Sequence, residues 1–272
     1  MSTRFRPFLR DGLRLSVAQG PGSGPVALFQ HGLCGDSAQT MEVMPHEDVT
    51  AVTLECRGHG RSDAGDPAGY GIARFADDVA ALAETLGTPR FVGGISMGAA
   101  IAARLAVLRP DLVRALVLAR PAWVTEPAPE NMVPNAEVGH LLTQPGQTVQ
   151  AFRNSPTGQR LAAQAPDNLT SLSGFFAREP RDVTSALLTR ISADGPGIAG
   201  DDLRALNIPC LIVATDEDAI HPLSHAQHLA RLIPDARLVT ITPKSRDRAA
   251  YAAEFRAALQ HFTRHLPHAQ TA

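Results

Sequence analysis

The five residues Gly94-Ile95-Ser96-Met97-Gly98 form a G-x-S-x-G pattern where one expected element ends and another begins. The short apolar run 91–95 is typical of a buried strand, and the alanine-rich run 99–108 is typical of a helix. A serine at such a strand-to-helix turn adopts a strained backbone, and the flanking glycines leave space for it. The turn lifts the hydroxyl above the sheet edge and points the first helical N–H groups, above all that of Met97, beside it. We therefore predict that Ser96 is a nucleophile.

Strand-like and helix-like runs alternate along most of the chain. The clearest helices are 72–86, which has apolar residues at helical spacing, and a last helix from about 248 to 266. Most strand-like runs are short and continuously apolar, as expected of strands covered on both faces. The expected strands are Leu13 to Ala18, Val26 to Gln30, Val49 to Glu55, Phe91 to Ile95, Leu112 to Ala119, Cys210 to Ala214 and Leu238 to Ile241. This order predicts an α/β fold: a mostly parallel central sheet, flanked by helices, with Ser96 at its carboxyl edge.

The alternation stops between residues 121 and 201, where prolines and helical patterns replace the strand-like runs. We expect this stretch to be a helical lid or cap inserted over the carboxyl edge of the sheet. Residues 1–120 and 202–272 would then form the core domain. The aromatic residues of the insertion are candidates for lining a substrate pocket, with packing inside the insertion as the alternative. They are Trp123, Phe175 and Phe176.

Composition narrows the expected partners. A chain of 272 residues can hold one domain with an insertion, and a net charge of -2 gives no reason to expect nucleic acid or an anionic membrane. It contains no apolar run of about 18 residues, the length of a transmembrane helix. Cys34, Cys56 and Cys210 lie far apart without metal-site spacing. We expect reduced thiols, a cytoplasmic location, no metal or cofactor, a small-molecule substrate, and a monomer or homodimer.

Three further segments, together with the serine turn, resemble the α/β-hydrolase fold superfamily over nearly the whole chain. Phe29-Gln30-His31-Gly32-Leu33 is similar to the His-Gly-x turn that follows the third strand in that family. Residues 55–63, Glu-Cys-Arg-Gly-His-Gly-Arg-Ser-Asp, are similar to its Asp-x-Arg-Gly-His-Gly-x-Ser turn. Residues 215–222, Thr-Asp-Glu-Asp-Ala-Ile-His-Pro, resemble the segment that carries the catalytic acid.

The resemblance implies roles for particular residues. Ser96 would be the nucleophile, and the backbone N–H groups of Leu33 and Met97 would form the oxyanion hole. Asp218 would be the acid that orients the base and stabilises its charged form. Asp216 competes for that role, but the spacing to the following proline favours Asp218.

The histidine that the family carries after its last strand is absent. Here that loop reads Thr-Pro-Lys-Ser-Arg-Asp-Arg-Ala over residues 242–249, and no histidine occurs between Pro243 and Gln260. His261 and His265 lie deep in the expected last helix, too far along it to reach Ser96. A serine hydroxyl needs a base within hydrogen-bonding reach, so a substitute is required for catalysis.

Two residues are candidates for that base. Lys244 lies nearest the expected position and could act if burial or neighbouring cations lowered its pKa from ~10.4, although it could equally be a surface or substrate-anchoring lysine. His221, three residues after Asp218, has an ordinary pKa of ~6.5 that suits a base, although it could be structural. His221 is slightly favoured. We expect His31 and His59 to have structural roles.

These motifs predict acyl transfer. The first hypothesis is a serine hydrolase that acts on an ester, thioester or lactone through Ser96 with a non-standard base. The second is a non-hydrolytic enzyme on the same scaffold, a lyase, isomerase or cyclase, in which Ser96 and the oxyanion donors bind a carbonyl. The third is a catalytically dead ligand-binding protein. The retained serine turn, oxyanion turn and acid favour the first hypothesis. The missing histidine alone fits the second and the third, whereas the intact serine turn argues against the third.

Overall fold

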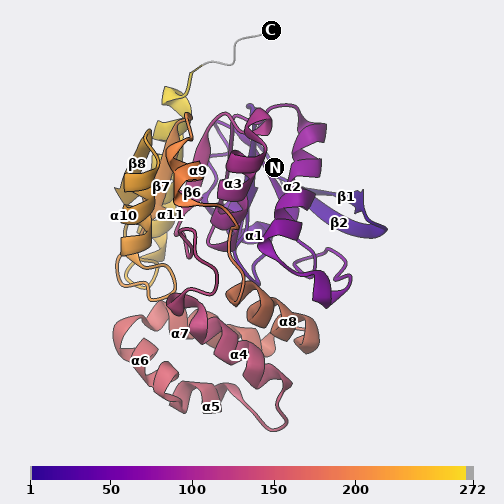
Figure 1. Cartoon of the computed structure of the whole chain (residues 1–272), viewed down its shortest axis with the longest axis vertical. Helices are drawn as coiled ribbons and strands as arrows, with labels where there is room; N and C mark the ends of the chain where they lie inside the picture. The colour runs from indigo at the N-terminus through magenta and orange to yellow at the C-terminus, as the bar shows by residue number, and fades with distance from the viewer. Residues whose placement is uncertain (1, 268–272) are drawn as a thin grey trace.

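The computed structural model describes residues 2–267 and contains an eight-stranded sheet with helices on both faces (Figure 1). Across the sheet the order is β1-β2-β4-β3-β5-β6-β7-β8. The strands are β1 (Arg4–Arg10), β2 (Leu13–Gln19), β3 (Val26–Gln30), β4 (Thr50–Glu55), β5 (Phe91–Ile95), β6 (Leu116–Ala119), β7 (Cys210–Ala214) and β8 (Ala236–Thr240). Strands β3 to β8 run parallel, whereas β2 pairs antiparallel with both β1 and β4. The predicted α/β fold with a mostly parallel sheet is confirmed.

Both faces of the parallel strands are buried. In β3, Leu28 packs into one core cluster, whereas its neighbours Ala27 and Phe29 pack into the cluster on the opposite face. One cluster includes residues of α2 (Ile72–Leu86), α3 (Met97–Leu108) and α10 (Leu223–Leu232), and the other includes residues of α1 (Ser37–Val43) and α11 (Arg248–His265). This double coverage explains why the strands read as continuous apolar runs in the sequence.

A group of helices follows β6 and precedes the short helix α9 (Gly200–Arg204). It comprises η3 (Glu130–Met132), α4 (Val133–Thr143), α5 (Val149–Asn154), α6 (Pro156–Gln164), α7 (Pro166–Gly174), η4 (Phe175–Ala177) and α8 (Arg181–Ser192). These helices gather at one end of the sheet, at the bottom of Figure 1. The Ser185 hydroxyl of α8 donates to the Gly139 carbonyl of α4 at 2.6 Å, which connects the two longest helices of this group. We call residues 121–201 the helical insertion; its action as a lid stays a prediction.

The structure differs from the sequence prediction near the ends of some strands. The strand expected from Leu112 begins only at Leu116, because residues 110–112 form a 3₁₀ turn that starts at a proline. Strand β1 is not predicted, because it pairs only with β2 at the sheet edge and most of its side chains stay exposed. Helix α10, directly after the acid segment, is also not predicted.

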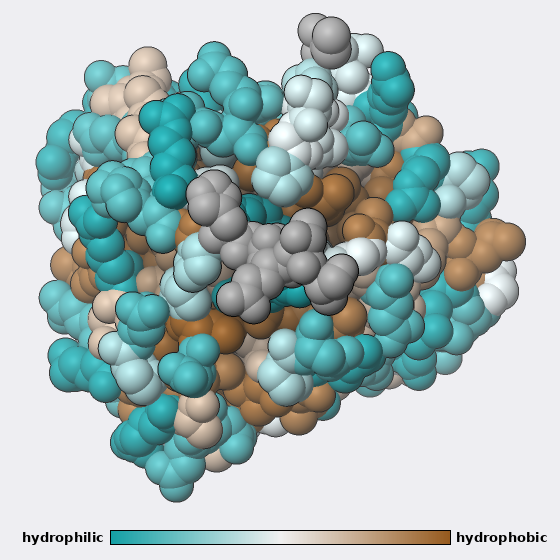
Figure 2. All heavy atoms as spheres, turned by 90° about the horizontal axis from the view of Figure 1, so that it is seen from above, coloured by the Kyte–Doolittle hydropathy of each residue, from teal (hydrophilic) through white to brown (hydrophobic). Residues whose placement is uncertain are grey.

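The end of the molecule away from α4–α8 is seen from above in Figure 2. Hydrophilic side chains form most of its rim, and hydrophobic atoms show between them (Figure 2).

Within residues 2–267, the helices are all too short or too polar to cross a membrane.

Ser96 occupies a strained turn between β5 and α3. Its backbone has φ 58° and ψ -112°, in the left-handed half of the map where residues other than glycine are uncommon. The glycines on either side make the turn possible. A Cβ added at Gly94 would overlap the Gly98 backbone, and one added at Gly98 would overlap the backbone of Gln30 in β3. The N–H of Ser96 donates to the Ala119 carbonyl of β6 at 2.9 Å, which anchors the turn to the sheet.

We predict that Gly98→Ala lowers the free energy of unfolding by about 1–3 kcal/mol, because the added methyl group forces α3 away from β3. The matched control is Gly174→Ala, at the end of α7, where φ is -64° and an added methyl group meets nothing within 4 Å. This control should leave stability unchanged or raise it by up to ~1 kcal/mol. Urea unfolding curves of both variants test the difference, and equal midpoints would contradict the packing argument.

Candidate active site

Ser96, His221 and Asp218 lie in line at the carboxyl edge of the sheet. The Ser96 Oγ is 2.8 Å from His221 Nε2. The other ring nitrogen of His221, Nδ1, is 2.9 and 3.0 Å from the two carboxylate oxygens of Asp218. A hydroxyl, an imidazole and a carboxylate in this order can act as a nucleophile, a base and an orienting acid.

The loop after β7 brings acid and histidine together through a local turn. The Asp218 Oδ1 accepts hydrogen bonds from the backbone N–H groups of Ile220, at 3.2 Å, and His221, at 3.0 Å. An aspartate that binds the N–H groups two and three residues ahead closes a tight turn. The turn folds the His221 side chain back over the carboxylate, and α10 begins directly after Pro222. The Asp-x-x-His spacing therefore places both side chains at one site.

Two further side chains hold the Asp218 carboxylate. Arg120, the residue after β6, donates to Oδ2 from Nε at 3.0 Å and from Nη2 at 2.6 Å. Asn168, from α7 of the helical insertion, donates from Nδ2 to Oδ1 at 2.9 Å and accepts from the Ala219 N–H at 2.7 Å. Neither residue belongs to a motif that the sequence analysis identified. Arg120 could have drawn attention because a charged residue directly follows a buried strand at the carboxyl edge.

The charges of the site suit a neutral histidine beside an ionised acid. Burial raises the pKa of Asp218, but Arg120 and His221 outweigh it and hold this pKa well below the usual range. Burial lowers the pKa of His221, and Asp218 only partly opposes that effect. Because the carboxylate accepts from Nδ1, the neutral ring carries its proton there. Nε2 is then free to accept the hydrogen bond of Ser96 Oγ.

Leu33 and Met97, the predicted oxyanion donors, flank Ser96. A Cβ on Gly32, the residue before Leu33, would lie 3.4 Å from the Ser96 Cβ, so this loop approaches the serine closely. Met97 begins α3 directly after Ser96. For the N–H groups of Leu33 and Met97, residues 2–267 provide no hydrogen-bond acceptor. Both remain available to a ligand.

His31 and His59 support the loop that carries Leu33. His31 Nε2 accepts from the Cys56 N–H at 3.0 Å, and its Nδ1 donates to the Gly32 carbonyl at 2.9 Å. His59 Nε2 accepts from the Cys34 N–H at 3.0 Å. Burial lowers the pKa of both histidines, that of His59 to well below its ordinary value. The expected structural roles of these two histidines are confirmed.

The structure does not bring Lys244 to Ser96. Its Nζ lies 3.5 Å from a carboxylate oxygen of Glu42 on α1 and 5.8 Å from the ring centroid of Tyr251. Glu42 also pairs with Arg248 at 2.9 Å, so a cluster of opposite charges holds this end of α11 against α1. The location of Lys244 in this cluster corrects its assignment as a candidate base.

Trp123 also lies away from the expected pocket. It is only 2 % exposed, and its indole Nε1 donates to the Asp194 carbonyl at 2.9 Å. This hydrogen bond fixes the indole in the core of the insertion, which corrects its assignment to substrate binding. Of the other two aromatic candidates, Phe175 lines the cavity at Ser96, whereas Phe176 packs beside Phe152 with ring centroids 6.0 Å apart.

A cavity of about 290 Å³ opens at Ser96 between the sheet edge and the insertion. From the insertion come Met132, Asn135, Asn168, Ser171, Leu172 and Phe175; from the core come Gly32, Leu33, Cys34, Gly35, Gln39, Ile95, Ser96, Arg120, Ile220 and His221. Asn135 is 5 % exposed, and its Oδ1 has no hydrogen-bond partner in the described part of the chain. A buried amide of this kind is a candidate for hydrogen bonding to substrate. Burial raises the pKa of the Cys34 thiol to about 12, so this thiol stays protonated.

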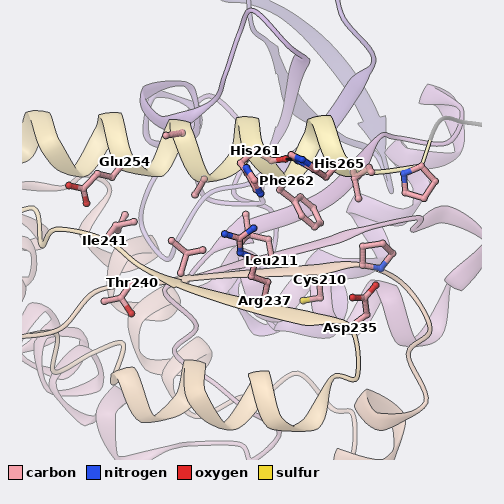
Figure 3. A pocket seen from close by; sticks show the side chains of 16 residues that line it. Cys210, Leu211, Asp235, Arg237, Thr240, Ile241, Glu254, His261, Phe262 and His265 are labelled. Carbon is pink, nitrogen blue, oxygen red and sulfur yellow. Dashed lines mark hydrogen bonds between the residues drawn. The ribbon is translucent and has the colours of Figure 1, made fainter.

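A larger cavity, of about 650 Å³, lies elsewhere, between β8 and α11 (Figure 3). Arg237, His261 and His265 line it beside Leu211 and Phe262. It shares no lining residue with the cavity at Ser96 and contains no nucleophile paired with a base. The smaller cavity is therefore the candidate active site. Over residues 2–267, no group of three or more His, Cys, Asp or Glu residues is placed to hold a metal ion.

Comparisons of sequence identify the family of the chain. A family model described as the alpha/beta hydrolase fold matches residues 25–245. A protein of Pseudomonas savastanoi pv. phaseolicola that bears the name carbamate hydrolase RutD is 29% identical over 236 residues, 80% of this chain and 85% of that protein. The 2-(acetamidomethylene)succinate hydrolase of Mesorhizobium japonicum is 37% identical over 99 residues, 35% of this chain and 35% of that protein.

Solved structures share the fold. Est816, described as an N-acyl homoserine lactone degrading enzyme, has a TM-score of 0.68 at 24% identity and covers 94% of this chain and 100% of its own. The enol-lactonase from Burkholderia xenovorans LB400 has a TM-score of 0.70 at 20% identity, with 94% of this chain and 99% of its own covered. At these identities the likeness concerns the architecture.

We predict that stability falls as the pH decreases through about 6.5. The pKa values of buried His31, His59 and His221 are lowered from 6.5, so the folded protein binds fewer protons than the unfolded chain in this range. The free energy of unfolding therefore rises with pH and levels off above the unfolded-state pKa. Urea midpoints measured between about pH 5 and 8 should show this slope.

His59→Gln should make the free energy of unfolding depend less steeply on pH, because it removes one buried group that must stay neutral in the folded protein. The control is His140→Gln, at an exposed position on α4, which should leave the slope as in the wild type. Identical slopes for wild type and His59→Gln would refute this explanation.

Proposed function

Since the chain belongs to the alpha/beta hydrolase fold family and is a hydrolase, we propose that it cleaves an ester, thioester or lactone through Ser96, with His221 as its base. The observation that carries the proposal is the 2.8 Å contact between Ser96 Oγ and His221 Nε2. His221 would thus act as the base in place of the histidine that is absent from the loop after the last strand.

In the proposed reaction, His221 Nε2 takes the proton of Ser96 while Oγ attacks the substrate carbonyl. The resulting oxyanion accepts hydrogen bonds from the N–H groups of Leu33 and Met97, and the loss of one such donor typically costs about 3–4 kcal/mol. Asp218 stabilises the imidazolium that forms. His221 then gives the proton to the leaving oxygen or sulfur, which leaves an acyl group on Ser96. A water molecule, activated by the same histidine, releases the acid product.

The helical insertion completes the proposed site as a lid. The insertion supplies part of the cavity wall opposite the sheet edge, so entry of substrate depends on this segment. The residues concerned include Asn135, Asn168, Ser171 and Phe175. The domain arrangement we propose is a core of residues 1–120 and 202–272 with the insertion, residues 121–201, as its cap. Opening and closing of the cap would set which acyl groups reach the serine.

The cavity supports a small substrate that carries polar groups. At about 290 Å³ it is at the lower end of the range for small-molecule pockets. The names of the relatives extend the candidates to carbamates and N-acyl amides, and the structural neighbours extend them to lactones. A first screen should therefore contain short-chain p-nitrophenyl esters, short thioesters, N-acyl lactones and small carbamates. The hydrolases among the relatives favour hydrolysis over the lyase, isomerase, cyclase or binding-only hypotheses.

We predict that Ser96→Ala and His221→Gln each lower kcat/KM on the best substrate of that screen by about 10²–10⁴-fold or more, because the first removes the nucleophile and the second removes the general base. Lys244→Met is the matched control: it removes the other candidate base but lies in the Glu42 cluster, so its kcat/KM should stay close to wild type. Circular dichroism verifies that each variant is folded.

Two results would contradict this assignment. Wild-type turnover in Ser96→Ala would exclude a serine nucleophile. Full activity in His221→Gln together with loss of activity in Lys244→Met would transfer the base role to the lysine.

A further inference from the structure

Arg120 combines a strained backbone with a mostly buried charged side chain. It directly follows β6, its backbone has φ 43°, and its N–H donates to the Val213 carbonyl of β7 at 2.6 Å. Its side chain is only 15 % exposed. A residue other than glycine with positive φ is strained, and such strain persists where the surrounding structure enforces it, often at functional sites. A buried arginine also requires a partner for its charge.

The partner of Arg120 is the acid of the site. Nε and Nη2 both donate to one oxygen of Asp218, Oδ2, at 3.0 and 2.6 Å. Nη2 also lies 3.3 Å from His221 Nδ1. The second carboxylate oxygen, Oδ1, accepts from Asn168 and from the loop backbone. Arg120 therefore fixes the oxygen that the loop backbone leaves free, which otherwise contacts only His221 Nδ1.

We propose that Arg120 is a positioning residue that holds the Asp218 carboxylate, and through it the His221 ring, in the orientation that Ser96 requires. This inference rests on the proposed role of His221 as the base. Without Arg120, Asp218 could rotate about its side-chain bonds while Oδ1 keeps its other partners. His221 Nδ1 would then lose one of its two carboxylate contacts, and Nε2 would lose its alignment with Oγ.

The charge of Arg120 has a second consequence. The titratable groups that face His221 are Asp218 on its own loop, Arg120 after β6 and His225 on α10. Burial lowers the pKa of His221, Asp218 raises it, and Arg120 adds to the lowering. Replacement of Arg120 by a neutral residue should thus raise the pKa of His221 and move the acidic limb of the pH–rate profile to higher pH.

An arginine suits this task better than a lysine. Its planar fork places two N–H groups on one carboxylate oxygen, whereas an ammonium group acts as a single charge with freely rotating donors. The guanidinium is thus carried by the residue after β6 and held by the loop of Asp218.

The test uses two variants. Arg120→Met removes both the charge and the N–H donors, whereas Arg120→Lys keeps the charge but loses the planar pair of N–H donors. The control is Arg109→Met, because Arg109 pairs with Glu84 and Asp111 in exposed ion pairs. Two quantities are measured in the full chain: the pH profile of kcat and KM on the best screened ester, and the titration of His221 followed by NMR of the ring nitrogens.

In Arg120→Met we expect kcat to fall by about 10–100-fold, the range found when residues that orient metal ligands are removed, with KM little changed. The His221 titration and the acidic limb should both move to higher pH. Arg120→Lys should show a smaller loss of kcat and a titration close to wild type. Arg109→Met should match the wild type in both measurements.

A folded Arg120→Met variant with wild-type kcat and an unmoved His221 titration would overturn the proposal. A rise in KM with unchanged kcat would also overturn it, because Arg120 would then bind substrate instead of orienting the acid. If Arg120→Met does not fold, Arg120→Lys decides, since wild-type kcat in that variant would show that the fork is not needed. The NMR titration does not depend on turnover, so it tests Arg120 even if Ser96→Ala showed that the proposed function is wrong.

Discussion

The close packing of α3 against β3 and β5 is the constraint on which the site depends. Gly98 leaves no room for a side chain against the backbone of β3, and Gly94 leaves none against Gly98. Because the helix begins this close to the sheet, Ser96 must adopt its strained turn at φ 58°. The turn directs Oγ into the cavity at the carboxyl edge and leaves the N–H of Met97 without an acceptor among residues 2–267. The base, the acid and the insertion are all arranged around that fixed hydroxyl.

In the proposed mechanism a single loop supplies both the acid and the base. Asp218 closes a turn on the backbone of His221, so the proposed acid also positions the proposed base. The loop after β8 has no part in the proposed mechanism, and its Lys244 pairs with Glu42. Arg120 and Asn168 take up the remaining contacts of the carboxylate. The acid is thus held from the sheet and from the insertion at the same time.

Much of this organisation is predictable from the sequence, for identifiable reasons. The bounds of β3, β5, β7 and α2 agree with the predicted ones, because buried parallel strands and an amphipathic helix leave clear patterns. Strand β1 shows no such apolar pattern in the sequence, because most of its side chains are exposed. The choice between His221 and Lys244 depends on how two loops fold back over Ser96, which spacing does not show. Arg120 and Asn168 reach Asp218 through contacts between segments far apart in the chain. Trp123 is misassigned because an aromatic residue fits a pocket or a core equally well.

Labelling with a fluorophosphonate tests whether His221 activates Ser96, because this reagent reacts with a serine activated by a base and needs no knowledge of the substrate. We expect one covalent adduct, located on Ser96 by peptide mass spectrometry, that forms far more slowly in His221→Gln and at the wild-type rate in Lys244→Met. An unlabelled wild type, or labelling of Ser96 that proceeds equally fast in His221→Gln, would contradict it.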